Sequence, residues 1–154
     1  MDRIYDIEEY LKRPYWVIDI LPHQVPDGSK GQFFKIEQFY LSPPRIELLC
    51  AKFVHILLKL NCYDDIAVSG YDGIWTENPA PEELARWVMD RKAIHVLLKS
   101  ADAMITAGGD DLYMTVYGPD EATLQLVSTL AAAQGLFVWN PCNQASGVNH
   151  ITTA

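Results

Sequence analysis

The sequence predicts one α+β domain, in which a mostly antiparallel sheet carries its helices on one face. Two observations predict this class. Short runs that alternate apolar and polar residues, as strands do, are interspersed with runs that repeat apolar residues at helical spacing. The chain has 154 residues, of which 49% are hydrophobic and 21% charged, so residues 1–154 suffice for a single globular core.

The N-terminal part of the chain predicts a short helix followed by a hairpin. Residues 4–13 favour a helix, which has to end before Pro14. Residues 15–21 form a β-rich run, and residues 33–41 resume as a second strand. The Pro-Asp-Gly sequence at 26–28 favours a turn in the long loop between the two strands.

The middle of the chain predicts two helices around a short strand. Residues 45–60 have a strongly amphipathic apolar stripe, and Ser42 before them is a candidate N-cap. Residues 65–69 favour a short strand, and residues 81–91 favour a helix that starts at a proline. Residues 92–100 are compatible with a helix or a strand, because tertiary context decides runs of this length.

The stretch 101–142 has the least ambiguous pattern. The Gly-Gly pair at 108–109 predicts a two-residue hairpin turn, because glycines supply the positive φ values that such a turn needs. Residues 112–117 alternate as a strand, and residues 120–135 carry both end signals of a helix. Residues 136–139 are apolar on both faces, which predicts an interior strand.

Two arrangements of these elements remain open. Residues 15–69 and 103–140 share the predicted order strand, strand, helix, strand, which is compatible with a duplicated β-β-α-β unit. Alternatively, residues 65–140 trace β-α-β-β-α-β, an order that resembles a ferredoxin-like fold. This likeness concerns topology and implies no activity. The polar residues 143–154 are expected to form a flexible tail.

Composition restricts the partners and the location. The net charge of −8 disfavours nucleic acid, because its phosphate backbone binds positive surfaces. No apolar run is long enough to span a membrane, and the first residues do not resemble a secretory signal. The cysteines Cys50, Cys62 and Cys142 form no CxxC pair, which is typical of a reducing compartment. We therefore expect a cytoplasmic protein.

The first candidate binding surface is the far face of the predicted sheet. Alternation places Tyr113 and Tyr117 on the face away from the helices, where Phe137 and Trp139 can join them. These four side chains would form a larger apolar patch than most monomers expose, with tyrosine and tryptophan as anchors for a partner. The alternative is that other parts of the chain, such as residues 1–14, cover this face.

The second candidate is the irregular loop over residues 71–81. It combines the aromatic residues Tyr71 and Trp75 with the carboxylates Asp72 and Glu77. Exposed loops of this composition are common recognition devices. The alternative is a plain connector whose apolar side chains turn into the core.

Three further carboxylates are candidate polar groups of a site. Asp65 and Asp111 each belong to an Asp-Asp pair at the start of a predicted strand. Neighbours on a strand point to opposite faces, so these residues are more typical of solvated turns. Asp19 differs because it interrupts an apolar run. It has to lie at an edge or be paired inside, and burial without a partner would raise its pKa.

The sequence contains no motif for catalysis, metal binding or a cofactor. No histidine has a partner at metal-ligand spacing, so we expect no metal and no cofactor, and an enzyme is the less favoured interpretation. The favoured function is a non-catalytic protein-binding module of the inhibitor or immunity type, whose acidic surface and aromatic patch bind a basic protein. One alternative is a small enzyme or small-molecule-binding protein with its pocket between the sheet and loop 71–81. Another is a homodimer that uses the aromatic face as its interface.

Overall fold

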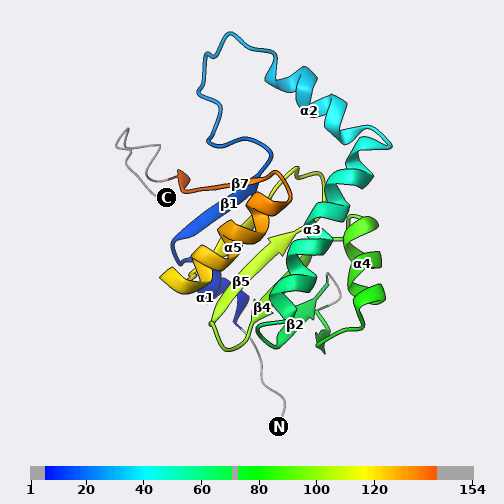
Figure 1. Ribbon diagram of the computed structural model, residues 1–154, viewed down its shortest axis with the longest axis vertical. Coiled ribbons are helices and arrows are strands. Elements are labelled where there is room, and N and C mark those ends of the chain that lie inside the picture. Colours follow the sequence, from blue (N-terminus) through cyan, green and yellow to red (C-terminus); the bar gives the residue numbers. More distant parts are fainter. Residues whose placement is uncertain (1–5, 71–72, 142–154) are drawn as a thin grey trace.

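An antiparallel sheet of seven strands runs through the computed structural model, which describes residues 6–70 and 73–141 (Figure 1). All six pairs of neighbouring strands are antiparallel. The predicted α+β class is therefore confirmed. Along the sheet, the strands lie in the order β3 (Trp75–Glu77), β2 (Ile66–Ser69), β4 (Ile94–Leu98), β5 (Ala103–Ala107), β6 (Met114–Tyr117), β1 (Tyr15–Asp19) and β7 (Phe137–Trp139).

One face of the sheet is covered by α3 (Arg45–Asn61), α4 (Pro81–Met89) and α5 (Glu121–Ala133), as Figure 1 shows. The spacing of apolar residues decides which side of each helix is buried. In α3 the whole predicted stripe is buried, namely Ile46, Leu49, Cys50, Phe53, Leu57 and Leu60. Among the described residues, no helix has both the length and the apolar character needed to cross a membrane.

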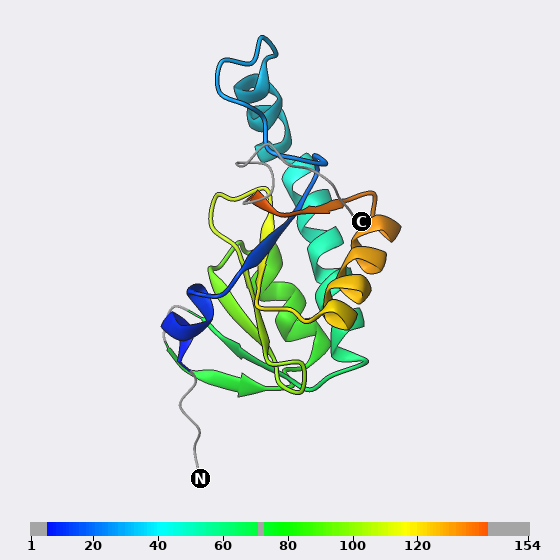
Figure 2. The same ribbon diagram turned by 90° about the vertical axis from the view of Figure 1, so that its left-hand side faces the viewer.

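The helix α1 (Ile7–Leu11) lies on the opposite face of the sheet (Figure 2). Tyr10 is buried there, and its hydroxyl donates to Asp102 Oδ1 at 2.6 Å. The expectation that the helices lie on one face is therefore wrong for α1. The sheet carries the apolar residues Ala67, Leu97 and Met104 on this face too. Because an apolar sheet face has to be covered, Tyr10 of α1 packs against them.

The segment predicted as the second strand of a hairpin is instead the helix α2 (Phe33–Leu41). Both sides of β1 are occupied, by β6 and by β7, so no position beside β1 is left for this segment. A helix satisfies its backbone groups locally, without a neighbouring strand. Figures 1 and 2 show α2 projecting beyond the sheet, and none of its residues is buried.

Three local predictions also differ from the structure. The glycine pair belongs to the longer loop 108–113, because Gly109 N–H donates to Arg91 O at 2.9 Å instead of closing a tight turn. Ser42 does not cap α3, since its hydroxyl donates to Gln38 O at 2.8 Å. The strand β7 lies at the edge of the sheet and not in its interior.

The strand order is not that of a simple ferredoxin-like fold. In the segment 66–139 the strands β2, β4, β5 and β6 follow one another as antiparallel neighbours, and β1 then separates β6 from β7. The segment 15–69 contains two helices between two strands, so it does not share its order of elements with 103–140. Residues 92–100, for which the sequence left two possibilities, contain the strand β4. The predicted tail, 143–154, lies outside the described residues.

Candidate functional site

Side chains of β1, β6 and β7 meet in rows on the sheet face that lies away from α3 and α5. Tyr15 is directly opposite Tyr117, and their ring centroids are 5.5 Å apart. In the next row, Val17 lies between Thr115 and Trp139. Side chains directly opposite each other in an antiparallel sheet are close enough to touch, so the strand register itself assembles this aromatic group.

The helix α1 covers the other half of this face. It packs with Ala67 of β2, Leu97 of β4 and Met104 of β5. Trp75 is half-buried against this cluster and is not a freely exposed loop residue. The chain thus covers part of the face with its own first helix, while the part formed by β6, β1 and β7 faces a pocket.

The pocket has a volume of about 550 Å³. The sheet forms its floor, and its walls are the loop after β1, the helix α2 and Pro141. Of the four predicted aromatic residues, Tyr113, Tyr117 and Trp139 line it, whereas Phe137 lies outside its lining and is 46% exposed. The volume lies within the range of about 300–1,000 Å³ that is usual for ligand sites.

Five aromatic rings line this pocket, each from a different helix, strand or loop. They are Tyr15, Phe33, Tyr113, Tyr117 and Trp139. Tyr113 is 40% exposed, and Tyr15 and Phe33 are also exposed, so several of the rings are open to solvent. Aromatic side chains gathered around a concavity are typical of a site that anchors part of a ligand or partner.

Asp19 supplies a carboxylate to this aromatic pocket. Burial raises the pKa of Asp19, and the Ile20 N–H, which donates to its Oδ1 at 2.7 Å, lowers it in part. The nearby Trp139 indole also lowers the pKa of Asp19, although the two groups do not have the geometry of a hydrogen bond. The Trp139 Nε1 is buried and has no hydrogen-bond partner among the described residues. Such an unpaired group is uncommon in a folded protein.

The charge in the pocket is negative. Asp19 and Glu37 line it, together with His23, but no lysine or arginine does. Nearby, burial and the adjacent Asp110 raise the pKa of Asp111. Burial also raises the pKa of the Tyr113 hydroxyl, followed by the negative charges of Asp111 and Asp19. The carboxylates thus create a negative potential on the side of the pocket where Tyr113 lies.

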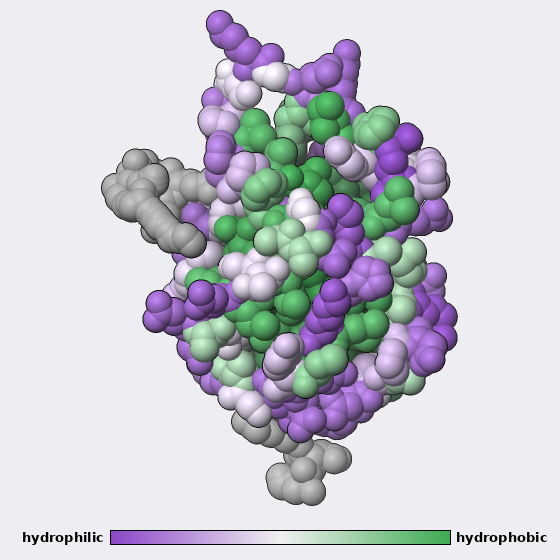
Figure 3. Space-filling view, in the orientation of Figure 1, coloured by the Kyte–Doolittle hydropathy of each residue, from purple (hydrophilic) through white to green (hydrophobic). Residues whose placement is uncertain are grey.

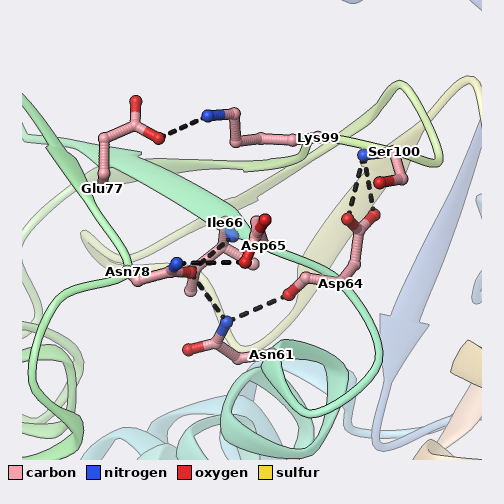
Figure 4. Close-up of polar contacts among 8 residues, drawn as sticks. All are labelled: Asn61, Asp64, Asp65, Ile66, Glu77, Asn78, Lys99 and Ser100. Atoms are coloured by element: carbon pink, nitrogen blue, oxygen red, sulfur yellow. Dashed lines mark hydrogen bonds and ion pairs between the residues drawn. The ribbon is translucent and has the colours of Figure 1, made fainter.

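Two other candidate carboxylates, Asp65 and Glu77, form part of a structural link between strands (Figure 4). Asp65 Oδ1 accepts from Asn78 Nδ2 at 3.1 Å, and Asn78 Oδ1 accepts from Ile66 N–H at 2.9 Å. Glu77 forms an ion pair with Lys99 on the same side of the sheet. These contacts connect the end of the edge strand β3 to the ends of β2 and β4, and neither Asp65 nor Glu77 lines the pocket.

The described residues of the second candidate site, the loop 71–81, do not line the large pocket. Tyr71 and Asp72 lie outside the described residues, and the rest of the loop includes the short strand β3. Ile74 and Thr76 line a separate hollow of about 150 Å³ with Trp87 of α4. Among the described residues, the walls of the large pocket come from the loop after β1 and from α2, and the described part of loop 71–81 lies elsewhere.

The described residues contain no group of three or more histidine, cysteine, aspartate or glutamate side chains that could hold a metal ion. His95 lies on β4, and its buried Nδ1 has no hydrogen-bond partner within the described part of the chain. Burial lowers the pKa of His95, which favours the neutral ring. His95 is not part of the pocket lining.

Sequence reasoning missed several residues of the pocket. Tyr15 alternates with Val17 and Asp19 on β1, so the period of the strand was a sufficient signal to place it beside Asp19. The position of Phe33 and Glu37 in a pocket wall could not be predicted in the same way, because their segment was predicted as a strand and is a helix. Both lie one helical turn apart on α2, which brings them to the same wall.

This arrangement can hold an apolar group against the rings and a polar group near Asp19, and nothing in it identifies a reaction. Comparison with known proteins supplies no ligand, since no family model, curated protein or solved structure matches the chain.

Proposed function

We propose that this chain is a non-catalytic protein-binding module, of the inhibitor or immunity type, that takes part of a partner protein into the aromatic pocket. The observation that carries this proposal is an open concavity of about 550 Å³ lined by five aromatic residues. Tyrosine and tryptophan side chains in such positions supply most of the binding energy of many protein interfaces.

The surface beside the pocket supports a protein as the partner. The helix α2 contributes Phe33 to the pocket wall and presents Phe34, which is 77% exposed, to solvent. Ile36, Phe39 and Leu48 are exposed in the same region. In Figure 3, hydrophobic side chains gather in the upper part of the view, where Figure 1 places α2 and the start of α3. A partner that enters the pocket can therefore also cover this apolar surface.

The charge of the chain favours a basic partner. The net charge is −8, and an acidic surface steers positively charged proteins toward it and repels nucleic acid. A cytoplasmic location belongs to the same proposal, since Cys50 and Cys62 are both free thiols. The proposed module would then cover a basic surface of a cytoplasmic protein.

Selection of random displayed peptides against the immobilised protein tests this proposal. We expect enriched peptides whose affinity falls about tenfold or more in Tyr113→Ala, because an interface anchor is removed. Tyr63→Ala is the matched control, since Tyr63 is 72% exposed and lies outside the pocket. Failure to enrich any peptide, or equal binding to both variants, would contradict the proposal.

A second candidate is a small-molecule-binding protein or small enzyme that uses the same pocket. The pocket volume favours it, and Asp19, His23 and Glu37 are titratable groups in one concavity. No hydrogen bond joins these three side chains in the described part of the chain, so an acid–base pair is not assembled. A neutral fragment that saturates the pocket and displaces no peptide would favour this candidate over the protein-binding module.

A further inference from the structure

We infer that the aromatic pocket is a receptor for one cationic side chain, a lysine or an arginine, which the partner protein inserts between the rings and the Asp19 carboxylate. This inference deepens the proposed function and rests on it.

The lining of the pocket carries negative charge that no lysine or arginine of the lining balances. Asp19 and Glu37 line the pocket, and neither forms an ion pair within the described residues, where the ion pairs involve Arg13, Arg91 and Lys99. A carboxylate that is partly removed from water is costly unless a cation or several donors compensate it. The Ile20 N–H donates to Asp19, and the Trp139 indole and the Leu21 N–H also lower the pKa of its carboxyl, but burial outweighs all three and none of them adds a positive charge.

The aromatic rings of the pocket offer faces that can bind a cation. The faces of tyrosine and tryptophan rings are negative, so they attract an ammonium or guanidinium group within about 6 Å of the ring centre. This chain already uses the interaction elsewhere, because the guanidinium carbons of Arg13 and Arg45 lie 4.3 Å and 3.8 Å from the ring centroids of Tyr10 and Phe39. Neither Tyr10 nor Phe39 lines the pocket, and among the described residues no arginine or lysine is seen over a pocket ring.

Apolar side chains surround the carboxylates of the pocket. Leu11, Leu21 and Val25 line the pocket together with the rings. Lysine and arginine both have a flexible apolar stem below a charged head, which suits a lining of this kind. An anionic group would meet two carboxylates and no lysine or arginine, so the pocket selects against it.

The experiment compares a charged probe with a neutral probe of similar shape. N-acetyl-lysine methylamide and its Nε-acetylated form are titrated into the ¹⁵N-labelled full chain. The indole N–H signal of Trp139, assigned from the spectrum of Trp139→Phe, reports occupation of the pocket. We expect the charged probe to bind about tenfold more tightly than the acetylated probe. N-acetyl-arginine methylamide and its citrulline analogue extend the comparison to the guanidinium group.

Variants separate the carboxylate from the general charge of the chain. Asp19→Asn should reduce the affinity for the charged probe about tenfold and leave that for the neutral probe unchanged. Asp27→Asn, a charge change on the exposed loop outside the pocket lining, should change neither affinity. The comparison of probes on the parent protein stands even if Asp19→Asn unfolds.

The inference is overturned if the two probes bind equally, if neither shifts the Trp139 signal, or if only the neutral probe does. Those results leave the proposed function standing as long as selected peptides still depend on Tyr113. Conversely, charge-selective binding of the probe without any peptide that depends on Tyr113 would remove the protein partner and keep the cation site.

Discussion

Burial raises the pKa of the Asp19 carboxyl, and the hydrogen bond from Ile20 offsets only part of that rise. The folded protein therefore binds a proton at Asp19 more strongly than the unfolded chain does. The resulting stability is fully present below the ordinary carboxyl value of 3.8 and is lost as the pH rises through the higher folded pKa. Ionisation of Asp19 is therefore a cost to the fold, as is common for groups kept for binding.

Because the folded pKa of Asp19 is raised, removing its charge by Asp19→Asn should not destabilise the protein at neutral pH. The variant should be as stable as the parent at neutral pH or more stable by up to about 1 kcal/mol, a small gain because solvent screens the partly open site. The difference should shrink as the pH falls toward 3.8, where the parent carboxyl becomes neutral too. Urea unfolding at both pH values measures it. A clearly less stable variant at neutral pH would show that the charge of Asp19 supports the fold.

Gly108 and Gly109 allow a second prediction for single residues. Gly108 has φ +109°, and a Cβ there would lie 2.0 Å from Lys92 O, a backbone atom that has little room to move. Gly109 has φ +71°, but no atom lies within 4 Å of its Cβ position. We expect Gly108→Ala to lower the free energy of unfolding by about 2–4 kcal/mol, and Gly109→Ala by about 1 kcal/mol. Equal losses in urea unfolding would show that the close approach to Lys92 is not what requires glycine.

Among the elements, α2 shows where sequence reasoning fails. Its sequence, residues 33–41, has aromatic side chains that favour a strand as strongly as its spacing favours a helix. The choice depends on what occupies the sides of β1, and the strands that do so, β6 and β7, come from the other end of the chain. In α3, by contrast, seventeen residues repeat one apolar stripe, so the local pattern suffices.

The same contrast applies to the candidate site. Alternation within 112–117 correctly separates Met114 and Val116, which are buried under the helices, from Tyr113 and Tyr117, which line the pocket. The walls of the pocket come from α2 and the loop after β1, and their positions depend on tertiary contacts that no local period encodes. The floor of the site could therefore be predicted from the sequence, and its walls could not.

Because α2 has no buried residue, we expect it to open without unfolding the rest of the protein. The amides of α2 should exchange with solvent at least about a hundredfold faster than those in the centre of α3, which is buried against the sheet. Hydrogen–deuterium exchange followed by mass spectrometry measures the difference. Protection of α2 equal to that of α3 would mean that a contact outside the described residues, or a second copy of the chain, holds the helix in place.

For the whole molecule, the alternative of a homodimer can be tested directly. The aromatic face is half covered by α1 and half occupied by the pocket, so it offers no flat apolar surface for a two-fold partner. We therefore expect the mass of a single chain in light scattering, also at high protein concentration. A dimer that Phe34→Ser dissociates would favour the exposed side of α2 as the interface instead. A dimer that Phe34→Ser leaves intact and Tyr113→Ala dissociates would restore the aromatic face as the interface.

The two edges of the sheet, β3 and β7, are three residues long in the described part of the chain. An edge strand offers its unpaired backbone groups as a template for strands from other molecules, and a short edge offers few of them. A protein with seven strands and exposed aromatic residues would otherwise be at risk of growing into fibrils. The short outer strands of this protein offer other chains few backbone groups to pair with, so its exposed aromatic residues are not combined with a long open sheet edge.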